Sequence, residues 1–186
     1  MLQKKQILRK SIGLFSLLFL SQNATAQSCS QYITDDWTNN RYIVHGNGTV
    51  TDQATNLMWK QCSEGLSGVN CADGAQTFHT WQDALALPEL LNADVGFGGY
   101  HDWRLPNIKE LQSLAAYNCT APSINATVFP YGAFEPINPY WSNSPVIDSP
   151  LSADNRSWVL SNDGLAITFL RTSNNKVRLV RTVTNP

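Results

Sequence analysis

The sequence predicts an α+β domain built on a twisted, mainly antiparallel sheet. Short β-prone runs separated by turn signals stand toward both ends of the chain, and two amphipathic helix patterns lie between them. A stretch rich in Pro, Asn and Ser at residues 118–154 follows the helices and predicts a long loop insertion. Strands and helices that are grouped in this way, rather than alternating, are typical of α+β folds.

Three strands are predicted near the start of the domain, at residues 42–44, 49–51 and 57–60. These runs contain the β-branched and aromatic residues that favour strands. Asn47-Gly48, between the first two runs, is a strong signal for a tight hairpin turn. Together the three runs predict an antiparallel meander.

Two helices are predicted in the middle of the chain. Thr80 with Asp83 forms a capping pattern for a helix over residues 81–92, which Pro88 interrupts. Asn107 with Glu110 stands in the same relation at the start of a second helix. Each helix has an apolar face for burial. The two faces consist of Ala84, Leu85, Leu87 and Leu91, and of Ile108, Leu111, Leu114 and Ala115.

The last third of the chain is predicted to return to strands. Residues 140–142 form a short strand within the long loop, and residues 158–160 form the next strand. Residues 166–171 and 177–183 are predicted to pair with each other as a final hairpin around the turn at 173–175.

The first 26 residues predict a secretory signal peptide. Four basic residues precede the apolar run 12–20, and Ala24-Thr25-Ala26 supplies the small-residue end. That run is far shorter than the roughly 20 residues of a membrane-spanning helix. An uncleaved anchor or a core helix is the alternative. We therefore expect an exported protein, secreted, at the cell surface or in the periplasm, with an irregular lead-in at 27–40 and one domain at 41–184.

The charge of the exported part is acidic. Four of the 13 basic residues and none of the 14 acidic residues lie within residues 1–26, which leaves a net charge of −5. A nucleic-acid binder needs a basic surface, so the charge argues against that class. The exported part also contains no apolar stretch that predicts a membrane span.

The four cysteines, Cys29, Cys62, Cys71 and Cys119, predict two disulfides, because an even number follows a signal peptide. Three pairings are allowed. Cys62 and Cys71 bracket a Gly-containing stretch that turns back easily, which favours Cys62–Cys71 and leaves Cys29–Cys119. No metal site is predicted, because there is no C-x-x-C pair and the histidines lack ligand spacing.

Several motifs stand in an order that resembles a known family. They are Tyr42-Ile43, Gly48-Thr49-Val50-Thr51-Asp52, Thr55-Asn56-Leu57-Met58-Trp59, the Cys62/Cys71 pair, Thr80-Trp81-Gln82-Asp83-Ala84, Gly98-Gly99-Tyr100-His101-Asp102-Trp103-Arg104-Leu105-Pro106-Asn107, Glu110-Leu111-Gln112-Ser113-Leu114, Tyr140-Trp141-Ser142 and Val177-Arg178-Leu179-Val180-Arg181. Over residues 41–183 the chain is similar to the Lcl C-terminal domain family, named after a collagen-like bacterial surface adhesin.

The resemblance implies a bacterial protein of the cell surface or periplasm without an established enzymatic activity. The adhesin namesake binds sulfated glycans, but no glycan-binding motif is shared residue by residue, and this chain is acidic. The block Trp103-Arg104-Leu105-Pro106 also resembles C-type-lectin-like domains. It implies a C-type-lectin-like fold, with two helices flanking a twisted antiparallel sheet and a long loop insertion.

The loop at residues 138–156 is the predicted ligand-binding site, because long polar loops are often functional. Asp148 and Asp154, together with two nearby asparagines, can supply oxygen ligands for Ca²⁺, although the spacing of a known calcium loop is absent. A solvated loop without a ligand is the alternative. The candidate ligand-binding residues are Tyr140, Asn143, Asp148, Asp154, Asn155 and Arg156.

Three other groups of residues have structural and functional interpretations. Arg104 is expected to be partly buried against Asp102 or Glu110. Of the six tryptophans, all but Trp37 are expected in the core, with sugar stacking as the alternative. Basic residues gather in the predicted final hairpin, where a charged sheet edge is expected and an anion site is the alternative. They are Arg171, Lys176, Arg178 and Arg181.

The pattern as a whole favours a recognition module of adhesin type that binds a glycan or a protein and catalyses no reaction. No cofactor is expected, and a bound Ca²⁺ is the alternative. An accessory subunit of a pilus, fibre or envelope complex is the second hypothesis. A hydrolase whose site is built from dispersed residues, such as His101 and Asp102, is the third.

Overall fold

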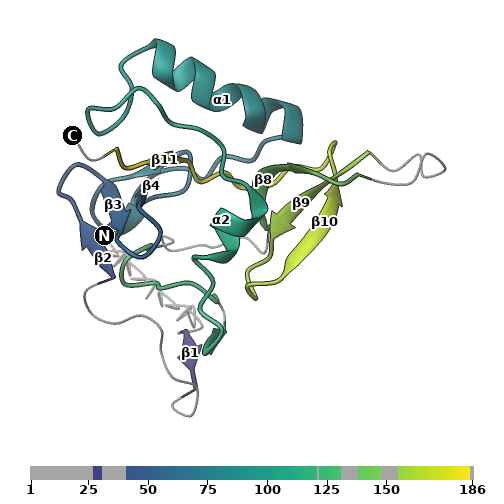
Figure 1. Cartoon of the computed structure of the whole chain (residues 1–186), viewed down its shortest axis with the longest axis horizontal. Helices are drawn as coiled ribbons and strands as arrows, with labels where there is room; N and C mark the ends of the chain where they lie inside the picture. The colour runs from purple at the N-terminus through teal and green to yellow at the C-terminus, as the bar shows by residue number, and fades with distance from the viewer. Residues whose placement is uncertain (1–26, 31–40, 121, 131–137, 148–154, 185–186) are drawn as a thin grey trace, which may run out of the picture.

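The computed structural model describes residues 27–30, 41–120, 122–130, 138–147 and 155–184. The predicted signal peptide and Trp37 lie outside these residues. The fold is α+β with antiparallel strand pairing, as predicted (Figure 1). Neither of the helices in the described ranges is long and apolar enough to cross a membrane.

The larger sheet has the strand order β11-β4-β3-β2. Its strands β2 (Tyr42–Val44), β3 (Thr49–Asp52) and β4 (Leu57–Lys60) confirm the predicted meander. Strand β11 (Val180–Thr182) joins it beside β4 in antiparallel register, with Val180 opposite Trp59. All four residues of β4 are buried, because both faces of this sheet are covered.

The second sheet has the order β10-β9-β8, formed by β8 (Tyr140–Pro145), β9 (Arg156–Leu160) and β10 (Ala166–Leu170). The predicted pairing of the last two strand segments is wrong, because β10 pairs with β9 and β11 belongs to the other sheet. Val177, Leu179 and Val180 are fully buried. A strand in an exposed terminal hairpin would leave some of these side chains in contact with solvent. Apolar burial therefore outweighs the local turn signal.

Two short ladders and a 3-10 turn complete the fold. Strand β1 (Ser28–Cys29), within a segment predicted to be irregular, pairs with β7 (Cys119–Thr120). Strands β5 (Leu66–Ser67) and β6 (Asp73–Gly74) flank the turn η1 (Val69–Cys71). Both predicted disulfides are confirmed: Cys29–Cys119 joins opposite residues within the first ladder, and Cys62–Cys71 lies beside the second.

Helix α1 (Trp81–Ala93) begins where predicted and runs across the top of the molecule in Figure 1. Its N-cap Thr80 accepts a hydrogen bond from the Asp83 N–H and donates to the Asp83 carboxylate at 2.6 Å. Pro88 is accommodated within the helix and is buried. Of the predicted apolar face, Leu85 is instead exposed, because the helix turns Trp81 and Ala84 to the core.

Helix α2 (Ile108–Gln112) confirms the predicted capping box. The Asn107 side chain accepts from the Glu110 N–H at 2.9 Å, and the Glu110 carboxylate accepts from the Asn107 N–H at 2.7 Å. The helix is short, but the chain continues in tight turns that bury Leu114 and Ala115. It packs against β8 and β9.

Two hydrophobic clusters cover the faces of the larger sheet. Trp59 belongs to one cluster with Leu111 and Leu114, while Met58 belongs to the other with Ala84 of α1. This division follows the two-residue period of a strand. Among the tryptophans predicted in the core, Trp59, Trp103 and Trp141 are buried, whereas Trp81 and Trp158 are only half-buried.

The cations of the C-terminal segment do not form a charged sheet edge. Lys176, Arg178 and Arg181 are all buried, and each lies over an aromatic ring. They enter the interior because the segment that contains them runs past β4, and their charges are stabilised there by π-faces and hydrogen bonds. The expectation of an exposed edge is therefore wrong.

Arg104 is paired as one of the two alternatives predicts. Its guanidinium contacts Glu110 at 2.6 Å, whereas Asp102 pairs with Arg181, also at 2.6 Å. Burial raises the pKa of Glu110. Hydrogen bonds from Arg104 and from the Asn107 N–H together lower this pKa by more than burial raises it, so the pKa of Glu110 lies below its usual value. The hydrogen bond from Arg181 is the main reason why the pKa of Asp102 is lowered.

Glu110→Gln is expected to destabilise the protein at neutral pH and to have a diminishing effect in acid. The lowered pKa of Glu110 stabilises the folded state above the ordinary value of 4.5, and this contribution is lost as pH falls through the folded-state value. Urea unfolding between about pH 7 and pH 3 measures the difference. Glu89→Gln, at an exposed position on α1, is the matched control. A constant difference between wild type and Glu110→Gln over that range would contradict the assignment.

Candidate functional site

The structure divides the predicted binding residues among different environments. Tyr140 is buried at the start of β8, and its hydroxyl lies 2.6 Å from the Ser63 hydroxyl. It is therefore not part of an exposed loop, because it anchors the second sheet to the disulfide segment. Asn143 is exposed on β8 and Asn155 is exposed just before β9. Asp148 and Asp154 lie outside the described residues, and the Ca²⁺ site built on them stays a prediction.

Arg156 begins β9 and donates to the Thr168 carbonyl of β10 at 3.1 Å. The predicted binding loop is thus framed by a hairpin, in which Trp141 and Val159 are opposite each other. Among the predicted residues that the structure describes, Asn155 lines a groove at the start of α1, and Tyr140 lines a smaller pocket beside α2.

This groove, hereafter the Trp81 groove, lies where the start of α1 meets the segments flanking β9 and β10. It encloses about 820 Å³ of empty space, including its open side. The Trp81 N–H donates to the Arg171 carbonyl at 3.0 Å, which joins the two walls. The groove is lined by Thr80, Trp81, Gln82, Leu85, Asn155, Arg171 and Thr172.

Trp81 and Arg171 form the rigid part of the Trp81 groove. The indole N–H donates to the Ser142 carbonyl at 2.8 Å, and the Arg171 guanidinium carbon lies 4.3 Å from the indole ring centre. Arg171 also donates from Nε to the Arg156 carbonyl and the Ser157 hydroxyl. The guanidinium lies over one face of the indole, so a half-buried ring that is held in this way presents only its remaining exposed surface, pre-ordered beside a cation.

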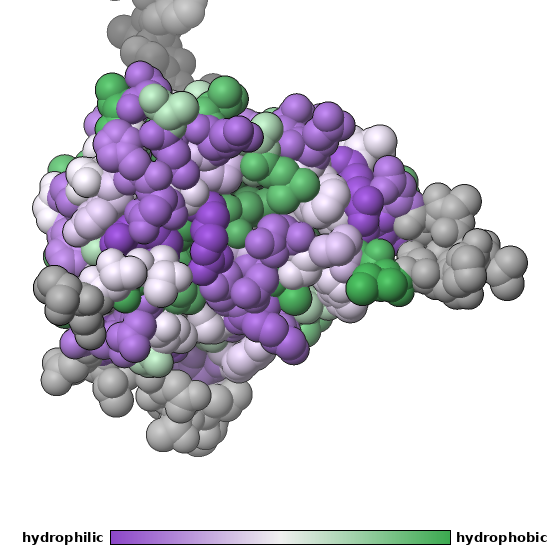
Figure 2. Space-filling model, turned by 45° about the horizontal axis from the view of Figure 1, so that its top comes forward, coloured by the Kyte–Doolittle hydropathy of each residue, from purple (hydrophilic) through white to green (hydrophobic). Residues whose placement is uncertain are grey.

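The rim of the Trp81 groove is polar. Gln82, Asn155 and Thr172 are exposed and can donate and accept hydrogen bonds. From the side on which α1 comes forward, the surface is largely hydrophilic, with hydrophobic areas bordered by polar residues (Figure 2). An aromatic platform with a polar rim is suited to a ligand that has one apolar face and many hydroxyl groups.

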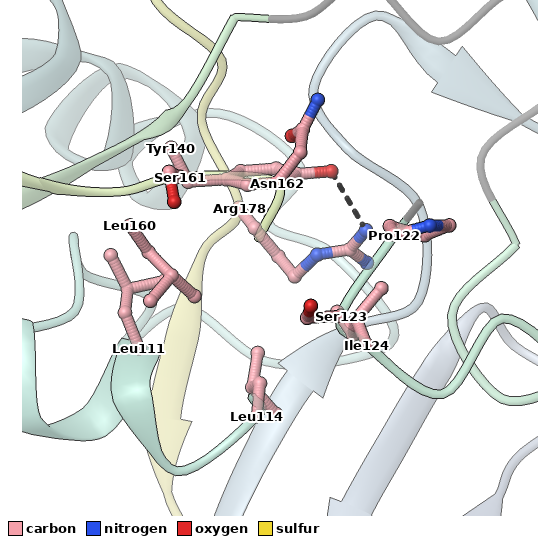
Figure 3. A pocket seen from close by; sticks show the side chains of 10 residues that line it. All are labelled: Leu111, Leu114, Pro122, Ser123, Ile124, Tyr140, Leu160, Ser161, Asn162 and Arg178. Carbon is pink, nitrogen blue, oxygen red and sulfur yellow. Dashed lines mark hydrogen bonds between the residues drawn. The ribbon is translucent and has the colours of Figure 1, made fainter. Parts of the chain in front are cut away.

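A second, smaller pocket, hereafter the Arg178 pocket, opens beside α2 (Figure 3). The Arg178 side chain reaches into it from the C-terminal segment and is 1 % exposed. Its Nη1 donates to the carbonyls of Lys60 and Gln61, and its Nη2 lies 3.3 Å from both the Ser63 and the Tyr140 hydroxyl. Within the described ranges, no carboxylate contacts this guanidinium.

Sequence reasoning named Trp81, Arg171 and Arg178 as binding residues only under its alternatives, which were sugar stacking for the tryptophans and an anion site for the basic residues. Trp81 was expected in the core because it begins a helix beside apolar residues. In the structure it is only half-buried. Arg171 belongs to the basic group for which an anion site was the alternative. A tryptophan immediately after a capping residue was the available signal, since the first turn of a helix lies next to the preceding loop.

The sequence model of the family described as the Lcl C-terminal domain matches residues 48–181. The matched range includes every residue that lines the Trp81 groove and the Arg178 pocket. No curated protein matches the chain.

Proposed function

Because the chain belongs to the Lcl C-terminal domain family, we propose that it is an exported recognition module of adhesin type that binds a glycan. The supporting observation is the Trp81 groove, in which a half-buried indole is fixed beside Arg171 and bordered by polar side chains. Sugar rings have an apolar face that packs on aromatic rings and hydroxyl groups that bind amides and guanidinium groups.

The proposal places the protein outside the cytoplasm. Two disulfides form in the structure, and such cross-links persist in oxidising compartments. The apolar run at the start of the chain is the proposed export signal.

The proposal also assigns a C-type-lectin-like fold. Two helices, two antiparallel sheets and the long segment between β7 and β8 support this assignment.

We further propose that the module catalyses no reaction. His45 and His79 hydrogen-bond to threonine hydroxyls, and His101 bonds to the Asn92 carbonyl. In the described part of the chain, none of these rings contacts a carboxylate, which a base in a hydrolytic site uses for orientation. The hydrolase hypothesis therefore has less support than the binding hypothesis.

Trp81→Phe is expected to weaken binding to the glycan selected on an array by about five- to tenfold, since a smaller ring stacks less well. Asn155→Ala is expected to weaken the same interaction several-fold by removing a rim hydrogen bond. Isothermal titration with the oxidised, full exported chain measures both effects.

The matched controls are Trp158→Phe, at a half-buried tryptophan outside the Trp81 groove, and Asn174→Ala, at an exposed asparagine outside it. If the control pair and the groove pair weaken binding equally, the site lies elsewhere. If wild type binds no glycan on the array, with or without Ca²⁺, the glycan proposal is wrong.

An assembly subunit is the second candidate, favoured by β10, which is an edge strand of its sheet in the described part of the chain. Ser161 and Arg171 each donate their N–H across the hairpin, to Leu165 and Asn155. By the alternation of an antiparallel ladder, Ala166 and Thr168 therefore turn their backbone groups away from β9, although the Thr168 carbonyl already accepts from the Arg156 side chain. Such an edge can accept a strand of a partner. Stable co-purification of envelope proteins, without glycan binding, would favour this candidate.

A further inference from the structure

We propose that the Arg178 pocket binds a small monocarboxylate with a short aliphatic body. The pocket lies between α2, the segment at residues 122–124 and the turn after β9 (Figure 3). It is lined by different residues from the Trp81 groove, so this binding is independent of the proposed glycan recognition.

The first argument is an unsatisfied donor. Arg178 uses its Nη1 and Nη2 groups on carbonyls and hydroxyls, but its buried Nε has no hydrogen-bond partner. Buried polar groups without partners are rare because each loses its hydration without compensation. An acceptor atom placed in the pocket beside this side chain would restore the missing hydrogen bond.

The second argument is charge. In the described ranges, the Arg178 guanidinium is balanced by carbonyl and hydroxyl dipoles and by the rings of Phe129 and Tyr140, but by no carboxylate. A buried cation gains more from an anion than from a neutral acceptor, because hydrogen bonds between charged groups are the strong ones. The preferred acceptor is therefore a carboxylate.

The third argument is the shape and lining of the pocket. Its empty space is about 350 Å³ with the open mouth included, and its inner part has room for little more than a water molecule. A sugar ring does not fit there, whereas one carboxylate oxygen does, with the short aliphatic body of the ligand lying in the open mouth. The apolar wall is formed by Leu111, Leu114, Pro122, Ile124 and Leu160, and Ser161 and Asn162 lie beside it.

The test is an NMR titration of the oxidised exported chain with isobutyrate, observed at the Arg178 Nε–H and at the methyl groups of Ile124 and Leu114. We expect saturable shifts at these groups. The uncharged isostere isobutyramide is expected to bind about tenfold more weakly, because it lacks the charge-assisted bond.

Ile124→Phe is expected to abolish the saturable shifts by filling the pocket from a half-buried position. Ile147→Phe makes the same change at a side chain that is 95 % exposed and is expected to leave them unchanged. Arg178→Lys, which keeps the charge but removes Nε, is expected to weaken binding if it folds.

Several outcomes would overturn the proposal. The first is the absence of saturation with isobutyrate, which would mean that the pocket holds only water. The second is equal affinity for isobutyrate and isobutyramide. The third is unchanged isobutyrate binding in Ile124→Phe. Failure of the glycan experiment leaves this result unaffected, because the Trp81 groove shares no lining residue with the Arg178 pocket.

Discussion

Asp52→Asn is expected to lower the free energy of unfolding by about 3–5 kcal/mol, the loss typical of breaking a buried ion pair. The Asp52 carboxylate is completely buried and accepts from Arg41 Nε at 2.9 Å and Nη2 at 2.7 Å. It also accepts from the Ala54 N–H at 3.1 Å. Asparagine keeps the shape of the side chain, so the loss reports the charge and the second guanidinium bond.

Urea unfolding at neutral pH measures this loss. Asp163→Asn makes the same change at an exposed residue in the turn before β10 and is expected to stay within about 0.5 kcal/mol of wild type. A loss below about 1 kcal/mol for Asp52→Asn would show that this pair behaves as a surface salt bridge does.

Removing the Cys29–Cys119 disulfide by double alanine substitution is expected to lower the free energy of unfolding by up to about 4.6 kcal/mol. The bridge spans 90 residues, so it strongly restricts the unfolded chain. The Cys62–Cys71 bridge spans only 9 residues, and the same chain-entropy relation gives about 2.6 kcal/mol for its removal.

The order of the two losses is the result to test, since both variants remove two sulfur atoms and differ mainly in loop length. Denaturant unfolding of each double variant, with the fully reduced wild type as a common reference, measures it. If removing Cys62–Cys71 costs more, native packing around the disulfide segment dominates over unfolded-state entropy. Packing around Cys71 would then be the cause, because this residue is buried and has a positive φ of 54°.

The elements that are controlled by neighbouring residues were predictable. The Asn107–Glu110 capping box and the Thr80 cap depend on side chains three residues apart, and both form. The first meander depends on the Asn47-Gly48 turn, in which Gly48 adopts a φ of 80°. Local sequence determines these features because the interacting groups are held together by the chain itself.

The partner of the final strand was not predictable in the same way. Val180 lies opposite Trp59, and nothing close to either residue in sequence encodes this pairing. The turn residues at 173–175 favour a different pairing, a hairpin between the two strand segments on either side of them. The choice is made by burial of Val177 and Leu179 between elements that are distant in sequence.

The residues of the candidate sites were also predictable only in part. Asn155 was predicted from its residue type in a polar loop, and it does line the Trp81 groove. Tyr140 was predicted on the same grounds, but its strand turns it inward to Ser63 and Arg178, so that it lines the buried Arg178 pocket and not a surface loop. Residue type indicates what a side chain can bind, whereas its exposure depends on which neighbours cover it.

By itself, the sequence determined the α+β class, the two helix starts, the disulfide pairing and the family of this protein. Only the tertiary structure decided the position of β11, the burial of Arg178 and the meeting of Trp81 with Arg171. Caps, turns and short loops are encoded by contacts within a few residues. Pockets and sheet order depend on long-range burial, in which many weak contacts between distant segments compete, and no local pattern records the outcome.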